Sequence, residues 1–180
     1  MEAPYTIVID DIERALAQSA IGGRLANLIY ETGRGWIFFG ETRFASRRHR
    51  FFLEPDLTVC LRDSVQEGRV DLRRIPGRNS KPYLEIEGCP DVLVEVVTED
   101  SSRPFPHACA EIGIPEVWRV DLRDKDLRFG LHSLRNGAYA TIEPDPEGWV
   151  RSPQLGLDFR LLRRRADPAP WRYTLEHRSA

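Results

Sequence analysis

The sequence has little lysine, little cysteine and no long apolar run. Only Lys81 and Lys125 among its 26 basic residues are lysines, so arginine carries nearly all of the positive charge. Three cysteines without a C-x-x-C pair argue against a disulfide framework and a common zinc motif, and they favour a reducing compartment. No apolar stretch approaches the roughly 20 residues of a membrane-spanning helix, and the acidic start MEAPYTIVIDD does not resemble a signal peptide. We therefore expect a cytoplasmic protein with no membrane partner.

The length and composition predict one globular domain. The chain has 180 residues, of which 41% are hydrophobic and 30% charged, values typical of a folded soluble protein. We expect an N-terminal helical segment over residues 1–35, a core over 36–160 and a basic tail over 161–180. Acids concentrate between residues 51 and 100, where there are eleven acids and six bases.

The apolar periodicity predicts an N-terminal helix followed mainly by strands. Residues 11–33 repeat at helical spacing, and Gly22 with Gly23 leaves open whether they form one helix or two. Short aromatic and β-branched runs begin at Trp36 and predict successive strands. Residues 63–82 are rich in turn-forming types and predict an excursion over the surface.

The second half of the chain predicts a buried strand, a short helix and further strands. The nearly continuous apolar run over 91–98 predicts a central strand that is buried on both faces. A short helix is expected between Pro106 and Gly113, then a strand, and then short strands over 127–159 with a hairpin at Asn136-Gly137. The fold class is therefore α/β, with a central mixed β-sheet flanked by α-helices and a β-rich C-terminal half.

Two carboxylates stand out within predicted strands. Glu95 interrupts the apolar run VLVEVV, although glutamate is rarely buried unless it is paired or binds a metal. Asp56 follows Pro55 in a strand-like run where aspartate is disfavoured. Two such oxygen donors suit Mg²⁺ or Mn²⁺, and phosphodiester hydrolysis is a reaction that such sites serve. Alternatively, Glu95 is a buried carboxylate satisfied by arginine or backbone donors and Asp56 caps a turn. We expect the other nine acids of residues 51–100 to lie on the surface.

Three motifs carry a family resemblance. EPDLTV, PDVLVEVVTEDSS and GIPEVWRVD resemble, in order and spacing, the bacterial Uma-type family of restriction endonucleases in the PD-(D/E)XK nuclease superfamily. The resemblance implies a restriction-endonuclease-like fold and Mg²⁺-dependent (or Mn²⁺-dependent) cleavage of DNA. It also implies that Asp56 and Glu95 are metal ligands, that the carbonyl of Val96 reaches the metal, and that a homodimer is possible. Trp118 in the third motif is expected to pack in the core.

The chain departs from the family pattern at the catalytic lysine. The superfamily lysine would stand at Val97, and the position to which it migrates in this family is Phe105; no lysine occurs between residues 96 and 124. Arg103 supplies positive charge nearby but cannot accept a proton at neutral pH. His107 can accept one if the start of its helix faces the site. For both residues, an ordinary structural or surface role is the alternative.

Three hypotheses follow for the function. The first is a Mg²⁺-dependent DNA endonuclease that uses Asp56 and Glu95. The second is a catalytically degenerate member that binds nucleic acid or a protein on the same scaffold, which the missing lysine favours. The third is a structural protein without a metal site, which would need the side chains of Asp56 and Glu95 to point apart. The arginine clusters over 47–50 and 163–165 either contact phosphates or form a solvated face.

Overall fold

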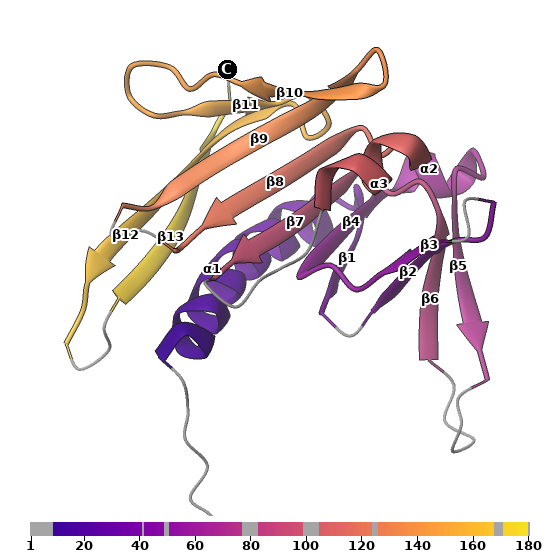
Figure 1. The fold of residues 1–180 in the computed structure, drawn as a ribbon, viewed down its shortest axis with the longest axis horizontal. Coiled ribbons are helices and arrows are strands. Elements are labelled where there is room, and N and C mark those ends of the chain that lie inside the picture. The colour runs from indigo at the N-terminus through magenta and orange to yellow at the C-terminus, as the bar shows by residue number, and fades with distance from the viewer. Residues whose placement is uncertain are drawn as a thin grey trace, which may run out of the picture.

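A six-stranded mixed sheet forms the centre of the protein, and two smaller sheets flank it (Figure 1). The computed structural model describes residues 9–40, 42–48, 51–76, 83–98, 105–123, 126–167 and 171–179, without the side chains of 9–11 and 105–108. In chain order the elements are α1 (Ile9–Glu31), β1 (Gly35–Phe39), β2 (Arg43–Ser46), β3 (Phe51–Leu53), β4 (Leu57–Leu61), α2 (Arg62–Gln66), β5 (Val70–Ile75), β6 (Tyr83–Gly88), β7 (Val92–Val97), α3 (Phe105–Ile112), β8 (Glu116–Asp121), β9 (Arg128–Arg135), β10 (Ala138–Ile142), β11 (Val150–Ser152), β12 (Leu157–Arg165) and β13 (Trp171–Arg178).

The central sheet confirms the predicted mixed architecture. Its strand order is β1-β4-β7-β8-β9-β10, with β7 and β8 parallel and the other neighbours antiparallel. All six residues of β7 are buried, as the apolar run predicts. The predicted hairpin at Asn136-Gly137 joins β9 to β10, and both turn residues have positive φ (52° and 79°), which favours asparagine and glycine there.

Helix α1 is one continuous helix, so its two glycines do not divide it. Gly22 is closely packed, because a Cβ atom there would lie 2.3 Å from Cε1 of Phe39 on β1. Gly23 would meet nothing within 4 Å. Ile21 and Leu25, four residues apart, are fully buried and direct this face of α1 toward the central sheet.

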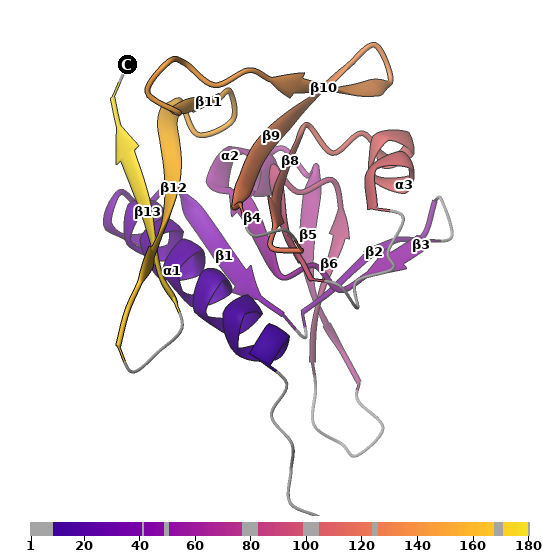
Figure 2. The ribbon, with the colours of Figure 1, turned by 60° about the vertical axis from the view of Figure 1, so that its left-hand side comes forward.

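Two cores lie on opposite faces of the central sheet. The first contains α1 and the three-stranded sheet β11-β12-β13, and the second contains α3 and the four-stranded sheet β3-β2-β6-β5. Figure 2 shows α1 between β1 and the β12–β13 hairpin. Trp118 is fully buried in the first core, as predicted, with its ring 4.7 Å from that of Phe159.

Two segments differ from the sequence-based expectation. Residues 63–82 were predicted to be a surface excursion, but their described part includes most of α2 and all of β5, which pairs with β6. The segment expected as a basic tail over 161–180 contains β13, in which Tyr173 and Leu175 are buried against α1. Alternating apolar residues were present in both segments, but the intervening arginines and prolines obscured them. None of the helices in the described ranges is long and apolar enough to span a membrane.

Candidate active site

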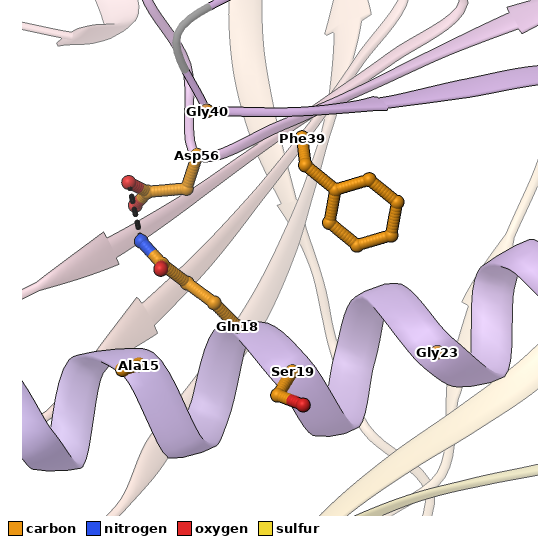
Figure 3. A pocket seen from close by; sticks show the side chains of 7 residues that line it. All are labelled: Ala15, Gln18, Ser19, Gly23, Phe39, Gly40 and Asp56. Carbon is orange, nitrogen blue, oxygen red and sulfur yellow. Dashed lines mark hydrogen bonds between the residues drawn. The ribbon is translucent and has the colours of Figure 1, made fainter.

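Asp56 lies one residue before β4 and is held from two directions. The residue is 6% exposed. Its Oδ1 accepts hydrogen bonds from Nη2 of Arg14 (2.6 Å) and Nε2 of Gln18 (2.7 Å), both on α1. Its Oδ2 accepts a hydrogen bond of 2.6 Å from the backbone N–H of Val96 on β7. Asp56 therefore connects the start of β4 to α1 and to β7; Figure 3 shows its bond to Gln18.

Glu95 lies within β7 and is 2% exposed. Its neighbours Val94 and Val96 belong to the core beneath α1, whereas Leu93 belongs to the core beneath α3. Strand alternation therefore directs Glu95 toward α3. Burial and, to a smaller extent, the charge of Glu95 raise the pKa of Cys109 on α3 to about 12, so the two side chains are electrostatic neighbours.

One peptide group connects the two acids. The N–H that Asp56 accepts belongs to the peptide that joins Glu95 to Val96. The strand register agrees, because Leu57 pairs with Val94 and the next step outward sets Asp56 opposite Glu95. Their side-chain neighbours nevertheless lie on different faces of the sheet, on α1 for Asp56 and on α3 for Glu95.

Arg14 and Gln18 explain why Asp56 turns toward α1. Continued strand alternation from Cys60, which faces α3, would direct the Asp56 side chain to the same side as Glu95. Arg14 and Gln18, four residues apart on one side of α1, hold it on the other side. Sequence analysis missed both residues, because their partner lies about forty positions away and no local pattern links them.

A small pocket adjoins Asp56 on the α1 side. It has a volume of about 420 Å³, and Figure 3 shows its lining between α1 and the end of β1. The lining residues are Ala15, Gln18, Ser19, Gly23, Phe39, Gly40 and Asp56. The carboxylate of Asp56 therefore borders a space that a ligand can reach.

Arg119 is a third residue that the sequence did not reveal. It pairs with Glu95 across the parallel strands β7 and β8, so both side chains leave the same face of the sheet. It lines a cavity of about 260 Å³ with Asp121, Arg128, Phe129, Gly130 and His132. Its contact with Asp121 is long, at 4.0 Å, and Asp121 is bound more closely by Arg123. Arg119 thus brings positive charge next to the motif glutamate.

His132 lies in the same cavity in its neutral form. Burial, with a smaller effect of the positive charge of Arg119, lowers the pKa of His132 below its usual value. Its Nδ1 is 3.2 Å from Oγ1 of Thr141. At neutral pH the imidazole therefore adds hydrogen-bonding capacity to this cavity without adding charge.

The remaining predicted site residues are less completely described. Arg103 lies outside the described residues. His107 is in α3, as predicted from Pro106, but its side chain is not described, and neither is that of Phe105 at the first position of α3. Within the described part of the chain, no three or more histidine, cysteine, aspartate or glutamate side chains form a group suited to a metal ion.

The expectation that the other acids of residues 51–100 lie on the surface is wrong for Glu85 and Asp91. Glu85 is 2% exposed and lies 2.5 Å from Nη2 of Arg47. Asp91 is fully buried and accepts hydrogen bonds from the N–H of Leu61 (2.6 Å) and Oγ of Ser64 (2.5 Å). These bonds stabilise the second core, so a buried carboxylate in this protein does not by itself mark a catalytic site.

Glu116 in the third motif is another buried carboxylate whose hydrogen bonds connect parts of the fold. It is fully buried and accepts hydrogen bonds from Nε1 of Trp118 (2.5 Å), Oγ of Ser152 (2.6 Å) and the N–H of Gln154 (3.1 Å). Burial raises the pKa of Glu116 above its usual value, despite these hydrogen bonds. The third motif therefore links β8 to β11 and to the turn that follows it.

Comparison with known proteins gives one family. Residues 10–164 match the family model Uma2, described as putative restriction endonuclease. No curated protein matches the chain. The matched range contains α1 except its first residue, all six strands of the central sheet, and both Asp56 and Glu95.

Proposed function

The chain belongs to the Uma2 family, and from that family's description we propose that it hydrolyses phosphodiester bonds of DNA with Mg²⁺ or Mn²⁺. The observation that carries the proposal is the 2.6 Å hydrogen bond between Asp56 and the N–H of the Glu95–Val96 peptide. It holds Asp56, one residue before β4, beside Glu95 in β7. A metal-dependent nuclease needs such a pair on one face of the sheet, whereas here Asp56 lies toward α1 and Glu95 toward α3.

The donor chemistry fits a hard divalent cation. Asp56, Glu95 and the carbonyl of Val96 would hold it, since Mg²⁺ prefers oxygen ligands and commonly takes one or two protein carboxylates. When bound, the cation polarises a phosphate oxygen and acidifies a water molecule. Arg14 competes for Asp56, because its guanidinium now neutralises that carboxylate. Cation binding therefore requires Asp56 to leave Arg14 and to turn toward Glu95.

Other side chains of the chain would bind and orient the substrate. Arg119, next to Glu95, supplies positive charge on the face where the family lysine is missing, and a guanidinium binds phosphate oxygens but does not act as a base. We assign Arg103 the same kind of charge contribution. His107, near the start of α3, is our candidate to accept a proton from the attacking water.

The direct experiment is a cleavage assay on single-stranded and double-stranded DNA with Mg²⁺ or Mn²⁺. We expect wild type to cut, and Glu95→Gln and Asp56→Asn to lose at least about 100-fold in rate, because each removes a charged ligand. Glu116→Gln is the matched control, since it neutralises another buried strand carboxylate outside the candidate site. Equal cutting by wild type and Glu95→Gln would reject this site.

A specific observation favours a second candidate function, a degenerate member that binds nucleic acid without cutting it. Nη2 of Arg14 lies 2.6 Å from Oδ1 of Asp56, and Nε of Arg14 is buried without a hydrogen-bond partner among the described residues. This arrangement puts a partly exposed guanidinium where an active nuclease would hold a metal, and a guanidinium binds phosphate oxygens. DNA binding with no cleavage in either metal would support this candidate over the first.

A further inference from the structure

The far end of the β12–β13 hairpin carries a concentrated positive charge. We define the arginine tip as Arg163, Arg164, Arg165 and Arg172 together with Trp171. Strand β11 pairs with β12 only over residues 157–159, so the tip belongs to a two-stranded ribbon beyond that point. Asp167 is the single acid between residues 161 and 174. The tip is thus strongly basic in a chain whose net charge is −2.

Charge pairing changes along the outer face of this hairpin. Near its base, Arg160 pairs with Glu176 across the strands at 2.7 Å. At the tip, Arg164 stands directly opposite Arg172, and both are exposed. No carboxylate in the described ranges forms an ion pair with either of them. Like charges that face each other across strands destabilise a sheet, so this pair is a cost for folding that an anionic partner would remove.

The two tryptophans of this sheet show the same contrast. Trp149 lies between Arg160 and Arg178, whose guanidinium carbons are 4.5 and 4.6 Å from its ring centre. Both arginines also bind carboxylates, for example Arg178 with Asp145 at 2.5 Å. This network is electrostatically satisfied within the protein and leaves little attraction for an external anion.

At the tip, arginines also stack on a tryptophan, and one of them, Arg165, forms no ion pair with a carboxylate among the described residues. Arg163 and Arg165 lie 4.5 and 5.7 Å from the ring centre of Trp171, and Arg165 is exposed. Stacking uses the flat face of a guanidinium and leaves its N–H edge available for phosphate oxygens. Trp171 therefore holds Arg165 in place for an anionic ligand, on the other face of the ribbon from Arg164 and Arg172.

The arginine tip lies at the same end of α1 as the candidate active site. The hydroxyl of Tyr173 donates a hydrogen bond of 3.4 Å to Oε2 of Glu13, and the next residue, Arg14, binds Asp56. A linear polyanion lying along this end of the molecule would reach both places.

We propose that the arginine tip binds the phosphate backbone of duplex DNA and anchors it beside the candidate active site. The choice of DNA as the partner rests on the proposed function, whereas the tip is a surface separate from Asp56 and Glu95. A two-stranded antiparallel ribbon fits a DNA groove, and arginine matches phosphate geometry. Contacts of this kind give affinity without sequence preference.

The test measures binding of a short fluorescent DNA duplex by anisotropy in EDTA, so that no cleavage occurs, over a series of salt concentrations. The variant Arg164→Gln/Arg172→Gln is compared with Arg74→Gln/Arg135→Gln, which removes the same charge from exposed strand positions elsewhere. We expect the tip variant to lose at least about 10-fold in affinity and about 2 in the slope of log affinity against log salt. The control should stay within about twofold of wild type.

Equal losses in both variants, an unchanged tip variant, or no binding by wild type would each overturn the proposal. Cleavage with Mg²⁺ is measured in parallel, so that failure of this inference can be told from failure of the proposed function. Binding that depends on the tip without cleavage leaves this inference standing and rejects the nuclease. Cleavage together with binding that does not depend on the tip rejects this inference and leaves the proposed nuclease standing.

Discussion

Replacing Arg14 with leucine tests how Asp56 is held. The variant removes a 2.6 Å ion pair while it keeps a residue with good helix propensity. Losing one partner of a buried pair costs about 3–5 kcal/mol. The cost here should be smaller, because the Arg14 side chain is 30% exposed and Asp56 keeps its bonds to Gln18 and Val96. We expect the free energy of unfolding at pH 7 to fall by about 2 kcal/mol.

Thermal melting measures this loss and its response to metal. A loss of about 2 kcal/mol lowers the melting temperature of a chain of this size by roughly 4–8 °C. Arg24→Leu, an exposed position on the same helix, should change it by no more than about 2 °C. Because Arg14 would compete for Asp56 with the cation that we propose, Mg²⁺ should raise the melting temperature of Arg14→Leu more than that of wild type.

Two results would refute this reasoning. A melting temperature of Arg14→Leu equal to that of Arg24→Leu would mean that the ion pair contributes nothing to stability. Equal shifts of wild type and Arg14→Leu in Mg²⁺ would mean that the guanidinium and the cation do not compete for Asp56.

Two further predictions concern stability. Gly22→Ala should lower the free energy of unfolding in urea by about 1–3 kcal/mol, because its Cβ would lie 2.3 Å from Phe39. Gly23→Ala, whose Cβ meets nothing within 4 Å, should raise it by up to about 1 kcal/mol. A loss of stability at both sites would argue against the packing explanation. Burial raises the pKa of Glu116 above 4.5, so the folded state binds this proton more tightly than the unfolded state. Proton binding therefore stabilises the fold below pH 4.5, and this contribution is lost as the pH rises through the raised pKa. Unfolding of Glu116→Gln measured from about pH 4 to pH 7 should therefore lose less stability with rising pH than wild type, and parallel curves would contradict the assignment.

Features that depend on local pattern were predictable from the sequence. The burial of β7 follows from its continuous apolar run, and the β9–β10 hairpin follows from Asn136-Gly137. The burial of Trp118 follows from its apolar strand. In each case the residues that determine the structure are adjacent in the chain, so periodicity and turn chemistry suffice.

Features that depend on distant partners were not predictable. Arg14 meets Asp56 across 42 positions, and Glu85 meets Arg47 across 38. Nothing near these residues in the sequence distinguishes a paired buried acid from an exposed one. The close packing of Gly22 is of the same kind, because the side chain that it meets, Phe39, lies on another element. Sequence analysis therefore found the motif acids but not the side chains that hold them.

The central claim is that Asp56 and Glu95 together support metal-dependent cleavage of DNA. Its most direct test is the rate at which purified wild type and Glu95→Gln nick one supercoiled plasmid in Mg²⁺, with melting curves to show that both are folded. The account predicts nicking by wild type that EDTA abolishes and that Glu95→Gln lacks. Nicking at the same rate by both proteins, or none by a folded wild type in Mg²⁺ or Mn²⁺, would contradict it.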